Sequence, residues 1–176
     1  MFDEPSPRRL AHIGGVCLQW SYLELLIGAI IWKLLNLEIE VGKIVTGGLD
    51  ILPRLNMAIN LCRELKADKR IVRALVTARK QLQDGLLERR NMVVHGQHWL
   101  LTGEIPLVEV QRGKGTRQPK PLPDGAIYDL VEAIGAVSNM IGTVLAECGF
   151  IDNLKLSELE KKALRTLLVV KPTDSN

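Results

Sequence analysis

Three side chains suited to proton transfer or phosphate binding lie close together in this 176-residue sequence. The segment RNMVVH places Arg90, Asn91 and His95 at the end of an apolar helical pattern, and Gly96 follows directly. A histidine has an ordinary pKa of about 6.5, so it can act as a base or an acid near neutral pH. An arginine stays charged and presents a planar fork to phosphate oxygens. These residue types therefore suit acid–base chemistry at a phosphate group.

The same residues also fit an ordinary helix end. Cations near a helix C-terminus are favoured by the helix macrodipole, and a glycine there can supply a left-handed cap. On that interpretation Arg90, Asn91 and His95 need no chemical role. The spacing alone leaves both interpretations open.

Helical geometry adds a condition to the functional interpretation. Asn91 and His95 are four residues apart and share a helix face, whereas Arg90 and His95 diverge by about 140°. One phosphate could meet both residues if the arginine arm wraps around the helix or if the helix loosens before Gly96. A second chain could also complete the site.

The elements that must position these residues are predominantly helical. Apolar spacing predicts helices over about residues 10–37, 52–66, 69–95, 124–148 and 157–170, the last opening with the capping-box pattern of Ser157 and Glu160. Between the first two helices, Gly42, Gly47 and Gly48 are expected to break helical continuity. Residues 98–122 contain β-like stretches, three glycines and three prolines, which predicts a β-hairpin or a long loop.

This pattern predicts an all-α fold. Long amphipathic helices with mostly short joints favour an antiparallel up-and-down bundle of four main helices plus a short C-terminal helix, with the hairpin or loop inserted before the fourth. We expect a single domain over residues 10–170, an extended or disordered N-terminus at 1–9 and a frayed tail at 171–176.

Composition favours a soluble, globular, cytoplasmic protein. Apolar residues make up 47% and charged residues 24%, and the net charge of +3 is too small to identify a nucleic-acid binder by itself. Any basic surface must therefore come from local clustering. The cysteines Cys17, Cys62 and Cys148 are far apart and odd in number, which predicts buried free thiols in a reducing compartment. The acidic, proline-broken start is unlike a secretory leader.

The first helix needs a separate test for membrane insertion. It is strongly hydrophobic between Val16 and Leu35, but Gln19, Glu24 and Lys33 interrupt it. A glutamate near the centre of a bilayer costs several kcal/mol, so a buried central helix is the simpler interpretation. Membrane association through this helix remains the alternative.

The segment Arg90-Asn91-Met92-Val93-Val94-His95, at the end of a long helix, resembles the Arg-x(4–6)-His signature of the HEPN superfamily. An asparagine often follows the arginine in that family, as it does here. The resemblance covers about residues 10–148, although only the six-residue motif is specific. Members are all-α bundles, and many are metal-independent RNases of toxin–antitoxin and other defence systems. They typically work as dimers whose two motifs face one cleft.

The resemblance implies roles for the three residues. RNA cleavage through the neighbouring 2′-OH needs a base for that proton, an acid for the leaving 5′-oxygen and positive charge against the phosphorane. His95 would be the acid or base, Arg90 would stabilise charge, and Asn91 would orient His95 or hold a substrate oxygen. Two motifs across a two-fold axis would supply both acid and base. We expect no cofactor and no metal, because a His95–His98 pair lacks further ligands.

Other residues have possible supporting roles. Glu24 could act beside Arg90, as an acidic residue of the first helix does in some HEPN families, or it could form a structural ion pair or lie exposed. His98 could be a second phosphate or base contact, or a surface strand residue. Four cations of the hairpin segment could hold RNA backbone, or form a solvated tip: Arg112, Lys114, Arg117 and Lys120. A second basic cluster is interpreted as a solvated turn: Arg63, Lys66, Lys69, Arg70 and Arg73.

The leading expectation is therefore a metal-independent endoribonuclease of HEPN type that acts on RNA as a dimer, with an antitoxin protein as a candidate partner. The main alternative is a non-catalytic module of the same fold that binds RNA or nucleotides, or that serves dimerisation. Trp20 and Trp32 lie at helical spacing on the first helix, which favours core or dimer packing over base stacking.

Overall fold

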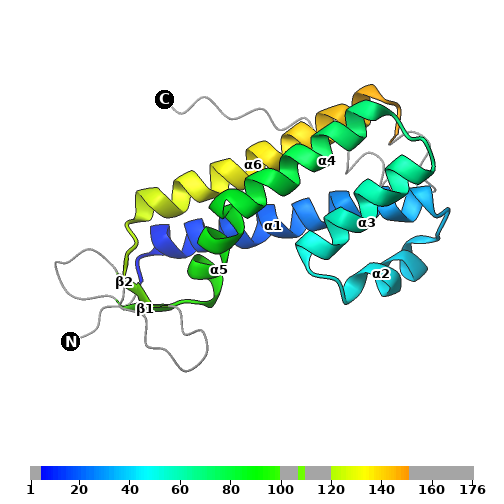
Figure 1. The fold of residues 1–176 in the computed structure, drawn as a ribbon. Helices are drawn as coiled ribbons and strands as arrows, with labels where there is room; N and C mark the ends of the chain where they lie inside the picture. Colours follow the sequence, from blue (N-terminus) through cyan, green and yellow to red (C-terminus); the bar gives the residue numbers. More distant parts are fainter. Residues whose placement is uncertain (1–4, 100–106, 110–119, 151–176) are drawn as a thin grey trace. The chain divides into compact units, whose positions relative to one another are not determined.

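The computed structural model describes residues 5–99, 107–109 and 120–150. Most of these residues are helical, which confirms the predicted all-α class (Figure 1). The elements are α1 (Pro7–Leu34), α2 (Ile39–Gly47), α3 (Ile51–Glu64), α4 (Lys69–Gln81), a π-helical turn η1 (Leu82–Leu86), α5 (Leu87–His95), β1 (Gln97–Trp99), β2 (Leu107–Glu109), β3 (Lys120–Pro121) and α6 (Asp124–Glu147). The predicted helix at 157–170 and the tail lie outside the described residues.

The chain divides into two compact units. The first unit contains Met1–Leu23 and Lys80–Ala136, and the second contains Glu24–Arg79 and Val137–Asn176. In the first, the largest apolar residues of the core are Val16, Trp20, Leu23, Leu82, Leu86, Val93, Leu122, Ile127, Leu130 and Ile134. In the second they include Leu26, Ile27, Ile30, Ile31, Trp32, Leu55, Ile59, Leu75, Ile141 and Leu145. Both tryptophans of α1 are therefore core residues.

The first helix begins at Pro7, three residues before the predicted start at residue 10. Ser6 explains the difference, because its Oγ accepts a hydrogen bond from the backbone N–H of Arg9 at 3.1 Å. A serine cap followed by proline in the first helical position is a strong start signal. Arg9, assigned from sequence to an extended or disordered N-terminus, is instead helical and 1% exposed.

The prediction that glycines break the chain after the first helix is wrong for Gly42. Helix α2 runs through it, and a Cβ added to Gly42 would lie 2.5 Å from the Trp32 indole. The glycine therefore permits close contact between α2 and Trp32. The Trp32 indole N–H also donates to Thr46 Oγ1 at 3.1 Å, which fixes the ring against the helix.

Gly42→Ala is expected to destabilise the protein by about 2 kcal/mol, because the new methyl group must displace the Trp32 ring from a packed core. The matched control is Gly14→Ala in α1, where an added Cβ meets nothing within 4 Å. That change should stabilise the helix by up to about 1 kcal/mol. Urea unfolding of both variants measures the difference. Equal effects of the two substitutions would contradict the close-contact role of Gly42.

The predicted continuous helix over 69–95 is interrupted. Helix α4 ends at Gln81, and the following turn η1 contains Gly85 with φ 120°, a left-handed conformation that favours glycine. An added Cβ at Gly85 meets nothing within 4 Å, so backbone conformation alone explains this glycine. The kink separates α4 from α5, the short helix that carries the RNMVVH segment.

The insertion before α6 contains a small antiparallel sheet of order β1-β2-β3. His98 pairs with Val108 across β1 and β2, and Val108 pairs with Lys120 across β2 and β3. Of the two predictions for this segment, a β-hairpin or a long loop, the described strands confirm the hairpin.

The cysteines differ from the prediction of three buried thiols. Cys62 is buried, Cys148 is half-buried and Cys17 is exposed. Burial raises the pKa of the Cys62 thiol to about 11, so it stays neutral at physiological pH. Apolar spacing placed Cys17 inside a helical pattern but did not reveal that it faces outward.

Among the described residues, two helices, α1 and α6, are long and apolar enough to cross a membrane by length and composition. The core helix of a soluble protein meets the same criterion. In α1, 44% of the most apolar window is buried inside the protein, and in α6 the share is 39%.

Candidate active site at the end of helix α5

Helix α5 carries the RNMVVH segment and leads directly into β1 (Figure 1). Val93 is 2% exposed and anchors the helix in the core of the first unit. Gly96 ends the helix with φ −75° and ψ 149°, and its N–H donates to the Met92 carbonyl at 3.1 Å. The expected left-handed glycine cap is therefore wrong, because Gly96 turns the chain straight into the extended conformation of β1.

The arginine arm wraps around the helix to reach the histidine. Arg90 Nη1 lies 2.9 Å from His95 Nε2 and donates to Asn91 Oδ1 at 3.0 Å. Since α5 remains helical through His95, the helix does not loosen before Gly96. The sequence left three routes open: a wrapped arginine arm, a loosened helix or a second chain. The structure shows the first, because the Arg90 side chain reaches from its own helix face to His95 within one chain.

Hydrogen bonding defines the form of the His95 ring. The guanidinium can only donate, so the His95 Nε2 that faces it must present a lone pair. The neutral ring then carries its hydrogen on Nδ1. His95 is exposed, and Nδ1 has no hydrogen-bond partner in the part of the chain that the structure describes.

Asn91 contacts the arginine in this arrangement. Its Oδ1 accepts from Arg90 Nη1, and within the described residues no hydrogen bond joins Asn91 to His95. The prediction that Asn91 orients His95 is therefore not met by a direct contact: Asn91 contacts the guanidinium, which in turn meets the imidazole. All three motif residues come together in one hydrogen-bonded cluster.

Trp20 forms a further support for the arginine that the sequence did not reveal. The Arg90 guanidinium carbon lies 4.9 Å from the centroid of the Trp20 ring, close enough for a cation–π interaction. Trp20 is 3% exposed, so its ring is a fixed surface on α1. Arg90 Nε is also buried and has no hydrogen-bond partner among the described residues. The guanidinium is thus held on one side while its Nη1 end reaches His95.

His98 belongs to a structural network and does not join the motif cluster. Its Nε2 lies 2.8 Å from the Val93 carbonyl oxygen, and its Nδ1 lies 3.1 Å from Arg9 Nη2. A carbonyl can only accept and a guanidinium can only donate, so the ring is neutral with its hydrogen on Nε2. With both ring nitrogens engaged, His98 links β1 to α1 and to the end of α5.

Arg9 is the centre of that network. Its Nη1 donates to the Leu122 carbonyl at 2.9 Å and to Asp124 Oδ1 at 2.7 Å, in addition to the contact with His98. A buried arginine with partners in three segments ties the start of α1 to β1 and to the start of α6. The serine–proline start of α1 was the sequence signal that could have placed Arg9 inside the structure.

The structure places Glu24 beside Arg54 in the second unit. The Glu24 carboxylate lies 4.0 Å from Arg54 Nη1, which also donates to the Glu24 carbonyl at 3.3 Å. Arg54 Nη2 donates to the carbonyls of Thr46 and Leu49 as well, so it closes the C-terminal end of α2. This geometry matches the structural ion pair left open from sequence.

Of the four hairpin cations proposed to hold RNA, only Lys120 lies within the described residues. It is exposed, in β3. Arg112, Lys114 and Arg117 lie outside the described residues.

What the first unit brings together is a surface histidine, a charged arginine and a supporting amide, at hydrogen-bonding distances. Within residues 5–99, 107–109 and 120–150, no group of three or more His, Cys, Asp or Glu side chains is placed to hold a metal ion. No protein-family model, curated protein or solved structure matches this chain.

Proposed function

We propose that the protein is a metal-independent endoribonuclease of HEPN type that acts through Arg90 and His95. The observation that supports this most is the 2.9 Å approach of Arg90 Nη1 to His95 Nε2 at an exposed helix end. A phosphate-binding group and a proton-transfer group therefore lie close enough to act on the same phosphate. The proposal includes the antiparallel up-and-down bundle, a cytoplasmic location and a place as the toxin of a toxin–antitoxin or defence system.

Substrate binding would exchange partners within the cluster. A phosphate oxygen is a stronger acceptor for the guanidinium than a neutral imidazole, because the hydrogen bond is assisted by charge. When Arg90 turns to the phosphate, the lone pair of His95 Nε2 becomes free to accept a proton. Trp20 keeps the guanidinium close during this exchange, and Asn91 limits how far it can swing.

The reaction would follow from this exchange. The 2′-oxygen attacks phosphorus, its proton passes to a base, and the bond from phosphorus to the 5′-oxygen breaks as an acid protonates that oxygen. The products are a 2′,3′-cyclic phosphate and a free 5′-hydroxyl. One cluster holds one acid–base histidine, so we propose a homodimer in which the second His95 supplies the other proton transfer.

The test is cleavage of a mixed RNA pool by purified protein in EDTA, followed by identification of the product ends. We expect 2′,3′-cyclic phosphate ends, and no cleavage of the same sequences made as DNA. The doubly substituted Arg90→Ala/His95→Ala protein, purified identically, measures contaminating nuclease. Equal cleavage by both proteins, or a requirement for added metal, would sink the proposal.

A second candidate is a binding module without turnover. One observation favours it: Arg90 Nη1 is satisfied within the chain by Asn91 and His95, as a polar helix end requires. Such a module would bind RNA or nucleotides, or serve dimerisation, and leave the RNA intact. Binding of the RNA pool without new product ends would identify it.

A further inference from the structure

A basic pocket lies at the turn between α3 and α4, in the second unit. Its cavity volume is about 570 Å³, within the range of small-ligand sites. Four cations line it: Arg63 from α3, Lys66 from the turn, and Lys69 and Arg73 from α4. All four are exposed, as the sequence interpretation of a solvated turn predicts, and they also border a hollow between the two helices.

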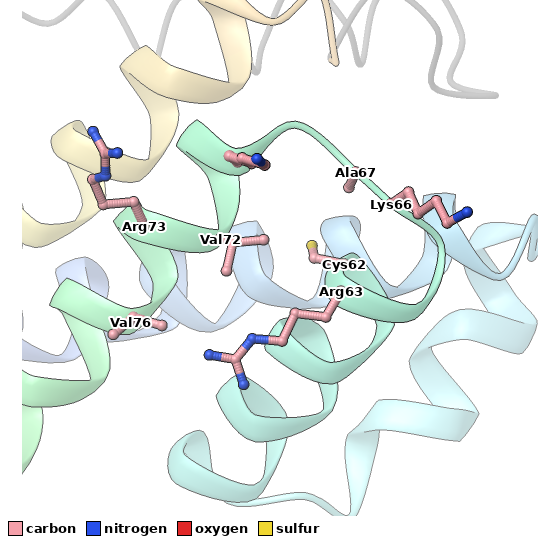
Figure 2. A pocket seen from close by; sticks show the side chains of 8 residues that line it. Cys62, Arg63, Lys66, Ala67, Val72, Arg73 and Val76 are labelled. Atoms are coloured by element: carbon pink, nitrogen blue, oxygen red, sulfur yellow. The ribbon is translucent and has the colours of Figure 1, made fainter.

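The lining combines this charge with apolar surface. Val72 and Val76 lie four residues apart on α4, and both are half-buried lining residues. Cys62 from α3 also lines the pocket, and its buried thiol is neutral because burial raises its pKa to about 11. Figure 2 shows the Arg63 side chain extending toward the two valines, while Lys66 and Arg73 extend outward at opposite ends of the view.

Among the described residues, none of the four pocket cations forms an ion pair, and no acidic residue lines the pocket. Arg70, at the start of α4, is different: its Nη2 lies 2.7 Å from Asp68 Oδ2, and its Nη1 lies 3.9 Å from Glu147 Oε2. Arg70 holds the pKa of Asp68 well below its usual range, so that carboxylate stays charged and engaged. Arg70, the paired cation of this region, is not among the residues that line the pocket, whereas the four cations that form no ion pair among the described residues are.

Lys66 occupies an unusual backbone position. It has φ 52°, in the left-handed region that favours glycine, and it ends α3 with bonds from its N–H to the Arg63 carbonyl and from Ala67 N–H to the Cys62 carbonyl. This is the Schellman geometry, in which glycine is the usual residue. The chain therefore carries a lysine at the pocket's rim where backbone conformation alone would select glycine.

From these observations we propose that the pocket binds a nucleotide unit, with the base against Val72 and Val76 and the phosphate against Arg63 and Arg73. A simple anion would need the cations but would leave the apolar surface uncovered. An apolar ligand would leave four charges in place with nothing to bind. A nucleotide offers both a flat base that can cover apolar surface and a phosphate that can meet an arginine. It can be a free nucleotide or one residue of an RNA strand, and this site does not depend on the proposed RNase activity.

The probe is a short fluorescein-labelled 2′-O-methyl oligoadenylate, which has no free 2′-hydroxyl to attack phosphorus. Binding is followed by fluorescence anisotropy, with AMP, ATP and inorganic phosphate as competitors. We expect binding that weakens as NaCl is raised, because the contacts to phosphate are exposed and screened. Competition by AMP and ATP assigns the site to free nucleotides, and binding of the oligonucleotide alone assigns it to an RNA strand; either result supports the proposal.

The variant test is Arg63→Ala/Arg73→Ala, which should weaken binding about tenfold. The matched control is Lys43→Ala/Lys80→Ala, which removes two charges at residues outside the lining and should bind like the unchanged protein. Equal losses in the two double variants would show nonspecific attraction and overturn the proposal. Displacement by inorganic phosphate as effective as that by AMP would also overturn it, and so would equal displacement by a polyglutamate peptide.

Lys66→Gly separates binding from backbone structure. Because it relieves the left-handed conformation, it should raise the melting temperature, while it removes one pocket cation and weakens binding about threefold. A residue with only a structural role would change the melting temperature alone, and that result would exclude Lys66 from the site. Loss of binding cannot then be ascribed to loss of folding.

Discussion

His95→Asn is expected to lower RNA cleavage at least about a hundredfold near neutral pH, with the fold retained. Asparagine is tolerated at helix ends, and its carbonyl oxygen can still accept a hydrogen bond from Arg90. It cannot take up or release a proton in this pH range. The substitution therefore keeps what a helix cap needs and removes what a nuclease needs.

Initial rates on one RNA substrate measure this effect, and thermal unfolding followed by circular dichroism checks the fold. The matched control is Arg89→Ala, because Arg89 is adjacent and exposed and makes only a long 3.4 Å contact with the Ala126 carbonyl in the described structure. Its cleavage rate should stay within about twofold of the unchanged protein, given that surface substitutions away from a site have small effects. Full activity of His95→Asn would contradict a catalytic role for His95 and support the interpretation of the motif as an ordinary helix end.

Arg90→Lys sharpens the same prediction. Lysine keeps the charge but has no planar fork, so it cannot hold Asn91, His95 and a phosphate oxygen in turn. We expect a loss of cleavage in Arg90→Lys nearly as large as that in His95→Asn. A lysine variant with normal cleavage would show that charge alone suffices and that the observed cluster geometry is incidental.

The residues of the candidate site were easier to identify from sequence than the side chains of other elements that support them. Arg90, Asn91 and His95 were identified by type and spacing because they lie within one turn and a half of one helix. Trp20 was not, because it comes from α1, and local spacing carries no information about which distant side chain covers an arginine. His98 was ambiguous for the same reason: its partner Arg9 is 89 residues away.

The helices were predicted where apolar periodicity is long and regular, as in α6. Glycine caused the main differences, because its meaning depends on packing. Gly42 lies inside α2 to admit Trp32, whereas Gly85 kinks the chain through its positive φ. Both look alike in sequence as possible helix breakers. The basic turn is solvated as predicted, since its cations are exposed, but a list of cations does not reveal a hollow between two helices.

Arg9→Met is the second substitution with a large expected effect, on stability. Methionine fills a similar apolar volume but leaves the Leu122 carbonyl and His98 Nδ1 without their donor, and Asp124 without its cation. Asp124 is 35% exposed and can be partly hydrated, so most of the loss comes from the two other partners. We expect the free energy of unfolding to fall by about 3 kcal/mol.

Urea unfolding of Arg9→Met, compared with Arg8→Met, isolates the contribution of the network, because Arg8 is adjacent and exposed. The control should change stability by less than about 0.5 kcal/mol. A double-mutant cycle of Arg9→Met and His98→Leu then measures the coupling free energy between the two residues. We expect it to be about 1 kcal/mol or more, because both belong to one hydrogen-bond network. Strictly additive losses would mean that the two side chains stabilise the first unit separately. A coupled loss would show that the start of α1 holds β1 in place, and with it the strand connection that directly follows His95.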